Sequence, residues 1–81
     1  MEKAIRLKVK KDLGPREQVN IIKLKGSLIS RGYTESIHIS DQDEEFHINT
    51  FETSGEQSNE VQEFIAAFIS RENLSEALSF K

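Results

Sequence analysis

Five apolar residues recur at helical spacing in the C-terminal third of this chain. Val61, Phe64, Ile65, Phe68 and Ile69 follow the i, i+3, i+4, i+7, i+8 pattern, which places them on one face of an α-helix. Ser58 or Asn59, just before this stripe, is suited to accept hydrogen bonds from the free N–H groups of a first helical turn. The pattern therefore predicts a helix that begins near residue 58 and faces the core.

The N-terminal segment has the pattern of a strand. Between Ala4 and Lys10, the apolar residues Ile5, Leu7 and Val9 alternate with cations, which is typical of a strand with one buried face. A secretory signal needs an uninterrupted apolar stretch of about 7 to 15 residues, and a membrane span needs roughly 20. The longest apolar run here is residues 64–69. We therefore expect a cytoplasmic location and no membrane contact.

A second helix is predicted from Pro15 to Arg31. Proline is well tolerated in the first helical turn, and Gly32 follows the last turn, where glycine commonly ends a helix. The stretch from Ile22 to Lys25 also alternates like a strand, so a β-hairpin with the first strand is the rival interpretation.

Lys25 is the residue that fits the helical interpretation least well. At about 100° per residue it falls on the apolar face that Ile21, Ile22, Leu28 and Ile29 form. We expect its aliphatic stem to lie on the core and its ammonium to reach the rim. A buried catalytic amine with a lowered pKa is the alternative.

Two strands joined by a turn are predicted in the middle of the chain, Thr34–Ser40 and Glu45–Phe51. Pairing them symmetrically about the acidic turn at residues 41–44 sets Ile39 opposite Phe46 and Ile37 opposite Ile48, on one face. The same register sets His38 opposite His47 on the other face. Their Cβ atoms would then be about 4.5 to 5.5 Å apart.

The end of the chain is ambiguous. After the polar loop at residues 53–58 and the helix that follows it, Leu74–Lys81 either prolongs the helix or forms a last strand that buries Leu78 and Phe80; the strand is favoured. The predicted order is βαββαβ in one domain, residues 1–81. We therefore expect a ferredoxin-like α+β sandwich, with two helices on one face of a four-stranded antiparallel sheet.

The open face of this sheet is the first candidate binding surface. It is predicted to collect Arg6, Lys8, Lys10, His38, His47, Asn49 and Phe51. Cations beside an aromatic residue resemble in outline the faces that bind single-stranded RNA or DNA. His38, His47 and Glu45 are weak candidates for a metal site, but zinc sites use three or four protein ligands. We therefore expect no metal and no cofactor.

Charge is divided unequally along the chain. Residues 1–33 hold nine Lys and Arg against three Asp and Glu, whereas residues 34–81 hold two against eleven. The helix that begins near residue 58 is expected to present an acidic surface made of Glu56, Glu60, Glu63 and Glu72. No set of residues resembles catalytic machinery. The leading hypothesis is a non-enzymatic interaction module for a protein partner; the alternatives are single-stranded nucleic-acid binding and a scaffold without a ligand.

Overall fold

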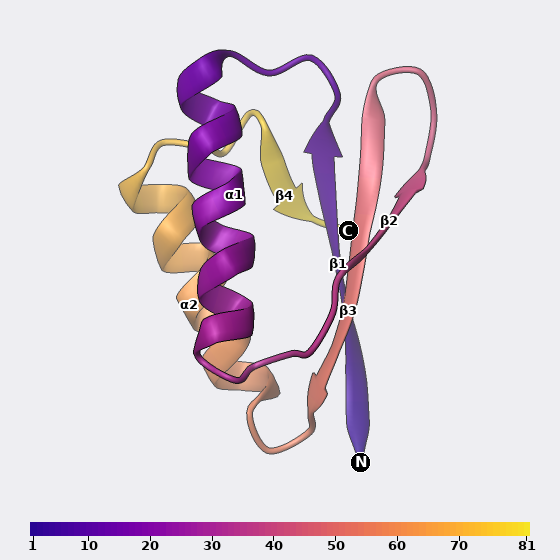
Figure 1. Cartoon of the computed structure of the whole chain (residues 1–81), viewed down its shortest axis with the longest axis vertical. Helices are drawn as coiled ribbons and strands as arrows, with labels where there is room; N and C mark the ends of the chain where they lie inside the picture. Colours follow the sequence, from indigo (N-terminus) through magenta and orange to yellow (C-terminus); the bar gives the residue numbers. More distant parts are fainter.

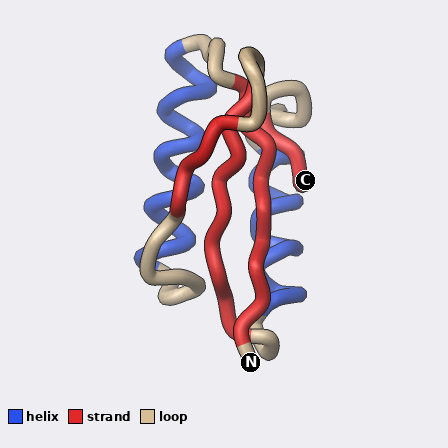
Figure 2. Tube along the Cα trace, turned by 90° about the vertical axis from the view of Figure 1, so that its right-hand side faces the viewer, coloured by secondary structure: helices blue, strands red, loops and turns tan.

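Six elements follow one another in the predicted βαββαβ order. The computed structural model describes all residues, 1–81. The elements are β1 (Glu2–Lys10), α1 (Pro15–Ser30), β2 (His38–Asp41), β3 (Phe46–Ser54), α2 (Ser58–Arg71) and β4 (Leu78–Phe80). The strands form one antiparallel sheet in the order β2-β3-β1-β4, and both helices lie on one of its faces (Figures 1 and 2). The predicted ferredoxin-like topology is confirmed.

The core lies between the helices and the sheet. The alternating apolar residues of β1, the α2 stripe and the inner face of α1 supply most of it. Buried members include Ile5, Leu7, Val9, Ile21, Leu24, Leu28, Val61, Ile65 and Phe68. Phe64 and Ile69 flank this cluster as half-buried residues. The two strongest patterns in the sequence therefore define the core. No helix of the chain has the length and apolar character that a membrane span requires.

The ends of α1 have local causes. Proline at the first position needs no hydrogen-bond acceptor for an N–H group, and the Gly14 N–H donates to Glu17 Oε1 at 3.0 Å. At the other end Gly32 adopts a left-handed φ of 76°. This lets the Tyr33 N–H turn back and donate to the Leu28 carbonyl at 3.0 Å. The helix is confirmed, and the alternative hairpin is wrong.

The last strand is confirmed but is short. Leu78–Phe80 pairs with residues 7–9 of β1. Leu78 is buried, whereas Phe80 remains 41% exposed. The expected burial of Phe80 is wrong because this residue lies on β4, a short strand at the edge of the sheet.

The predicted register of the β2–β3 hairpin is wrong by three residues. His38 lies opposite Thr50, and Asp41 lies opposite His47. Side chains alternate between the two faces of a sheet, so a register shift by an odd number of residues moves every β3 side chain to the other face. His38 stays on the open face, whereas His47 lies on the helix side.

Two interactions explain the shift. In the turn, Asp43 Oδ1 accepts hydrogen bonds from the N–H groups of Glu45 and Phe46, at 2.8 and 2.9 Å, which moves the centre of the hairpin toward β3. In the sheet, β3 pairs with β1 over nine residues. That pairing sets Phe51 beside Ile5 in the core, where it is 1% exposed.

Candidate functional site

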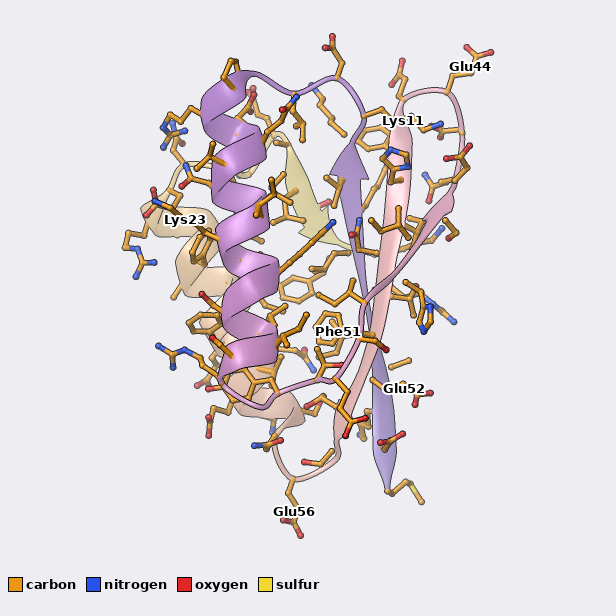
Figure 3. The ribbon with its side chains drawn as sticks, viewed as in Figure 1. Lys11, Lys23, Glu44, Phe51, Glu52 and Glu56 are labelled. Carbon is orange, nitrogen blue, oxygen red and sulfur yellow. The ribbon has the colours of Figure 1, made fainter.

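The structure divides the predicted open-face set between the two faces of the sheet. Arg6, Lys8, Lys10 and His38 lie on the open face, as expected. His47, Asn49 and Phe51 lie on the helix side, and Figure 3 shows Phe51 between α1 and the sheet. The seven residues therefore do not form one surface, because β3 is turned over relative to the prediction.

A different aromatic residue lies on the open face. Phe46 is half-buried there, and the Nζ of Lys8 lies 4.1 Å from the centre of its ring. Lys81 Nζ donates a 2.6 Å hydrogen bond to Gln42 Oε1. Cations and the acidic turn of the hairpin meet at this end of the sheet, because Lys8 lies close to Asp43, and Lys10 lies close to Glu44 and Glu45.

The opposite end of the open face is acidic. Glu2 and Glu52 lie close together there, because Ala4 of β1 pairs with Glu52 of β3. A hydrogen bond to the Glu52 carboxyl group, together with repulsion between the two groups, raises the pKa of Glu2. Two interacting carboxyl groups therefore lie at this end of the open face.

The two histidines do not form a pair. They lie on opposite faces of the sheet, so they cannot share an ion with each other. His47 Nδ1 instead lies 3.2 Å from Asp41 Oδ1, and Lys11 Nζ lies 3.3 Å from the same oxygen. No group of three or more His, Cys, Asp or Glu residues is placed to hold a metal ion.

The predicted acidic surface of α2 is partly engaged within the chain. Glu60 accepts a 2.6 Å hydrogen bond from the Tyr33 hydroxyl. Glu72 forms ion pairs with Arg71 at 3.2 Å and Arg16 at 3.9 Å. Glu56 and Glu63 are exposed and form no ion pair. Two of the four carboxylates therefore remain free for a partner.

A groove of about 260 Å³ lies between α1 and the helix side of the β2–β3 hairpin. Its α1 wall is formed by Gln18, Ile21, Ile22 and Lys25. Its sheet wall is formed by Ile39, His47 and Asn49, and one end is closed by Val9, Lys10, Lys11 and Leu13. The groove exists because β2 lies at the edge of the sheet, next to α1.

The groove keeps apolar side chains in contact with solvent. Ile22 on α1 is 68% exposed, and Ile39 on β2 is 59% exposed. Val19 and Ile29, on the same side of α1 by helical spacing, are also exposed. Neighbouring exposed apolar residues of this kind mark interaction surfaces more often than isolated ones do.

Polar groups without partners also line the groove. Asn49 is 2% exposed, and its Oδ1 accepts no hydrogen bond. His47 Nδ1 is buried and lacks a well-aligned hydrogen bond in spite of the nearby Asp41 oxygen. Lys25 is half-buried and forms no ion pair, and burial lowers the pKa of its ammonium group. The expected position of Lys25 at the rim of the core is confirmed.

A larger hollow lies elsewhere in the molecule and has a different character. It has a volume of about 490 Å³ and lies where the chain diverges from β3 before His38. Tyr33 and Phe51 are its only apolar lining residues, whereas five apolar residues line the groove beside α1. Since protein-binding surfaces combine apolar area with a few polar groups, the smaller groove is the better candidate site.

The sequence contained one signal for this site, the mixed face of α1 around Lys25. The contribution of Ile39 was missed, because the predicted register covered this residue with the helices. Comparison with protein-family models, curated proteins and solved structures found no match. The fold and the groove define a small ferredoxin-like α+β domain with an exposed apolar groove. This topology supports many unrelated functions, so the function has to be argued from the groove.

Proposed function

We propose that the protein is a non-enzymatic protein-interaction module that binds a segment of a partner protein in the groove between α1 and β2. One observation carries the proposal: Ile22 and Ile39 line the two walls of one groove and are both more than half exposed. A partner's apolar side chains would remove both from water. Such burial is worth about 25 cal/mol per Å² of apolar area.

The free edge of β2 adds a second means of contact. The Gln42 N–H donates to the Phe46 carbonyl, and alternation along the ladder then directs the backbones of Ser40 and His38 toward β3. The N–H and C=O groups of Ile39 therefore point away from the sheet. An extended segment can pair with such an edge while its side chains fill a neighbouring groove.

The charged residues of the groove indicate which kind of partner segment would bind there. Lys11 and Lys25 line the groove, and no carboxylate does. Lys11 has an ion-pair partner, Asp41, whereas Lys25 has none. Complementary charge speeds association and favours matching partners, so the groove suits a segment that combines acidic and apolar residues.

The test uses a capped pentapeptide of alternating valine and glutamate as a probe, followed by amide NMR of the labelled protein. We expect shift changes at residues on both walls of the groove. Ile39→Ser should abolish most of them. Phe80→Ser removes a comparably exposed apolar residue from the far edge of the sheet, so binding should persist in this control. Unchanged groove resonances at millimolar peptide would refute the proposal.

Single-stranded nucleic-acid binding on the open face is a second candidate function. The observation that favours this function is the position of Phe46, whose ring lies beside the Lys8 ammonium group on that face. Stacked bases and phosphate contacts would use these two groups. Titration with a mixed-sequence single-stranded oligonucleotide at low salt should shift the resonances of Phe46 and Lys8, and Phe46→Ala should remove the response. A response that survives this substitution would argue against base stacking here.

A further inference from the structure

The C-terminal half of β3 has one edge without a strand beside it. β2 pairs with β3 only as far as His38 and Thr50, and the segment before His38 runs toward the end of α1 (Figure 2). β3 continues to Ser54, and there it pairs only with β1. The hollow of about 490 Å³ described above lies along this free edge, because residues 50–54 line one side of it and residues 32–36 line the other.

The hydrogen-bond pattern of the sheet directs backbone groups of β3 toward the hollow. The Gly55 N–H donates to the Met1 carbonyl, and bonded residues alternate along an antiparallel pair, so the odd-numbered residues of β3 bond with β1. The even-numbered Glu52 and Ser54 therefore direct their N–H and C=O groups toward the free edge. The Ser54 carbonyl accepts a hydrogen bond from the following turn, whereas the N–H and C=O of Glu52 bond with no other backbone group.

The hollow is acidic. Glu2, Glu35 and Glu52 line it, and no lysine or arginine does. None of these three carboxylates forms an ion pair. A hydrogen bond to the Glu52 side chain, and then repulsion from it, raise the pKa of Glu2. A cation placed beside Glu52 would offset this repulsion.

Thr53 lines the hollow from the helix side of β3. It is 2% exposed, and its Oγ1 forms no hydrogen bond, although buried polar side chains are almost always hydrogen-bonded in native proteins. Residues directly opposite each other on neighbouring strands have their side chains on the same face, and threonine pairs of this kind form hydrogen bonds. A threonine or serine on an added strand would therefore give the Thr53 hydroxyl the partner that it lacks.

We propose that the free edge of β3 binds an extended basic segment of a partner protein, which adds a short strand beside Glu52. The residue opposite Glu52 exchanges two backbone hydrogen bonds with it and is a lysine or arginine, because its side chain lies beside the Glu52 carboxylate, which points away from the helices (Figure 3). The next residue lies opposite Thr53 and is a threonine or serine. This site shares no residue with the groove between α1 and β2 and does not depend on it.

The binding test compares two capped pentapeptides, alternating threonine with lysine or with glutamine, by amide NMR at low salt. The lysine peptide should shift the resonances of residues 50–54 and bind about fivefold more tightly than the glutamine peptide. Glu52→Gln should remove this preference. Glu56→Gln is the matched control, because Glu56 does not line the hollow and points into solvent from the loop after β3 (Figure 3). It should retain the preference.

Two further peptides test the addition of a strand. N-methylation of both lysine residues keeps their charges and removes the backbone donors that face Glu52, so affinity should fall about tenfold. N-methylation of the central threonine is the control, because the backbone of this residue faces away from β3. It should leave binding close to that of the unmodified lysine peptide.

Each contrary outcome refutes the proposal. Equal binding of the lysine and glutamine peptides would refute the basic preference, and equal loss in Glu52→Gln and Glu56→Gln would assign the effect to overall charge. Unchanged binding after N-methylation of the lysines would exclude strand addition. Ile39→Ser, which should abolish binding in the groove beside α1, should leave the response to the lysine peptide unchanged. Shifts confined to that groove would refute the β3 site and leave the proposed function intact.

Discussion

The hydroxyl of Tyr33, in the loop after α1, donates a 2.6 Å hydrogen bond to Glu60 on α2. The ring of Tyr33 also meets Phe64 of α2 edge to face, with 5.9 Å between the ring centres. One side chain therefore connects the segment leading to β2 with the second helix. These contacts hold the loop that follows α1 against α2, and the same loop leads into the hairpin of β2 and β3.

The hydrogen bond to Glu60, together with burial, raises the pKa of Tyr33 above its ordinary value of 10.0. A raised pKa in the folded state stabilises the fold fully below the unfolded value, and the contribution is lost as the pH rises through the folded value. We expect the urea midpoint to fall above about pH 10. Tyr33→Phe keeps the ring and removes the hydroxyl, so this variant should show a smaller fall. An equal fall in both proteins would exclude Tyr33 as its source.

Asp43 fixes the turn of the hairpin. The backbone N–H of Glu45, the main cause, lowers the pKa of the Asp43 carboxyl group, so the stabilisation is present above pH 3.8 and is lost as the pH falls through the lower folded value. Asp43→Ala should speed amide hydrogen exchange at Glu45 and Phe46. Glu44→Ala is the control, because Glu44 points into solvent at the tip of the hairpin (Figure 3). Equal acceleration in both variants would contradict this role.

Two glycines should respond in opposite ways to the same substitution. A Cβ at Gly26, in the middle of α1, would meet no atom within 4 Å, so Gly26→Ala should raise the free energy of unfolding by about 0.5 to 1 kcal/mol. Gly32 has a φ of 76°, a left-handed conformation in which an alanine side chain is strained. Gly32→Ala should therefore lower the free energy of unfolding by about 1 kcal/mol. Urea denaturation measures both changes. Stabilisation by both substitutions would contradict the left-handed end of α1.

Truncation of the buried Phe51 should destabilise the protein far more than truncation of the exposed Phe80. At 1% exposure, Phe51→Ala should cost about 3 to 5 kcal/mol of unfolding free energy. Phe80→Ala, at 41% exposure, should cost about 1 kcal/mol or less. If the two variants unfold at the same denaturant concentration, Phe51 does not lie in the core.

The sequence predicts the elements of this fold better than their pairing. The alternation in β1 and the stripe in α2 each have a single periodic solution, so these elements and their buried faces follow from local pattern. β3 has apolar residues on both faces, with Phe46 and Ile48 on one and Phe51 on the other. Local pattern therefore leaves its orientation open, and the long pairing with β1 decides it.

The groove could be predicted only in part for a related reason. Lys25 was conspicuous because it interrupts the apolar face of α1. Ile39 and Asn49 join it only when the hairpin has its actual register and β2 is the edge strand. These contacts join residues far apart in the chain, so neither periodicity nor spacing contains them.

The shortness of β2 limits what can add to the edge of the sheet. The strand has four residues, His38–Asp41, and it lies at one edge of the sheet. Very short edge strands are one of the means by which proteins avoid edge-to-edge aggregation. A second copy of the chain would gain few backbone hydrogen bonds along β2, so this edge should not cause aggregation in the way that a long free strand does.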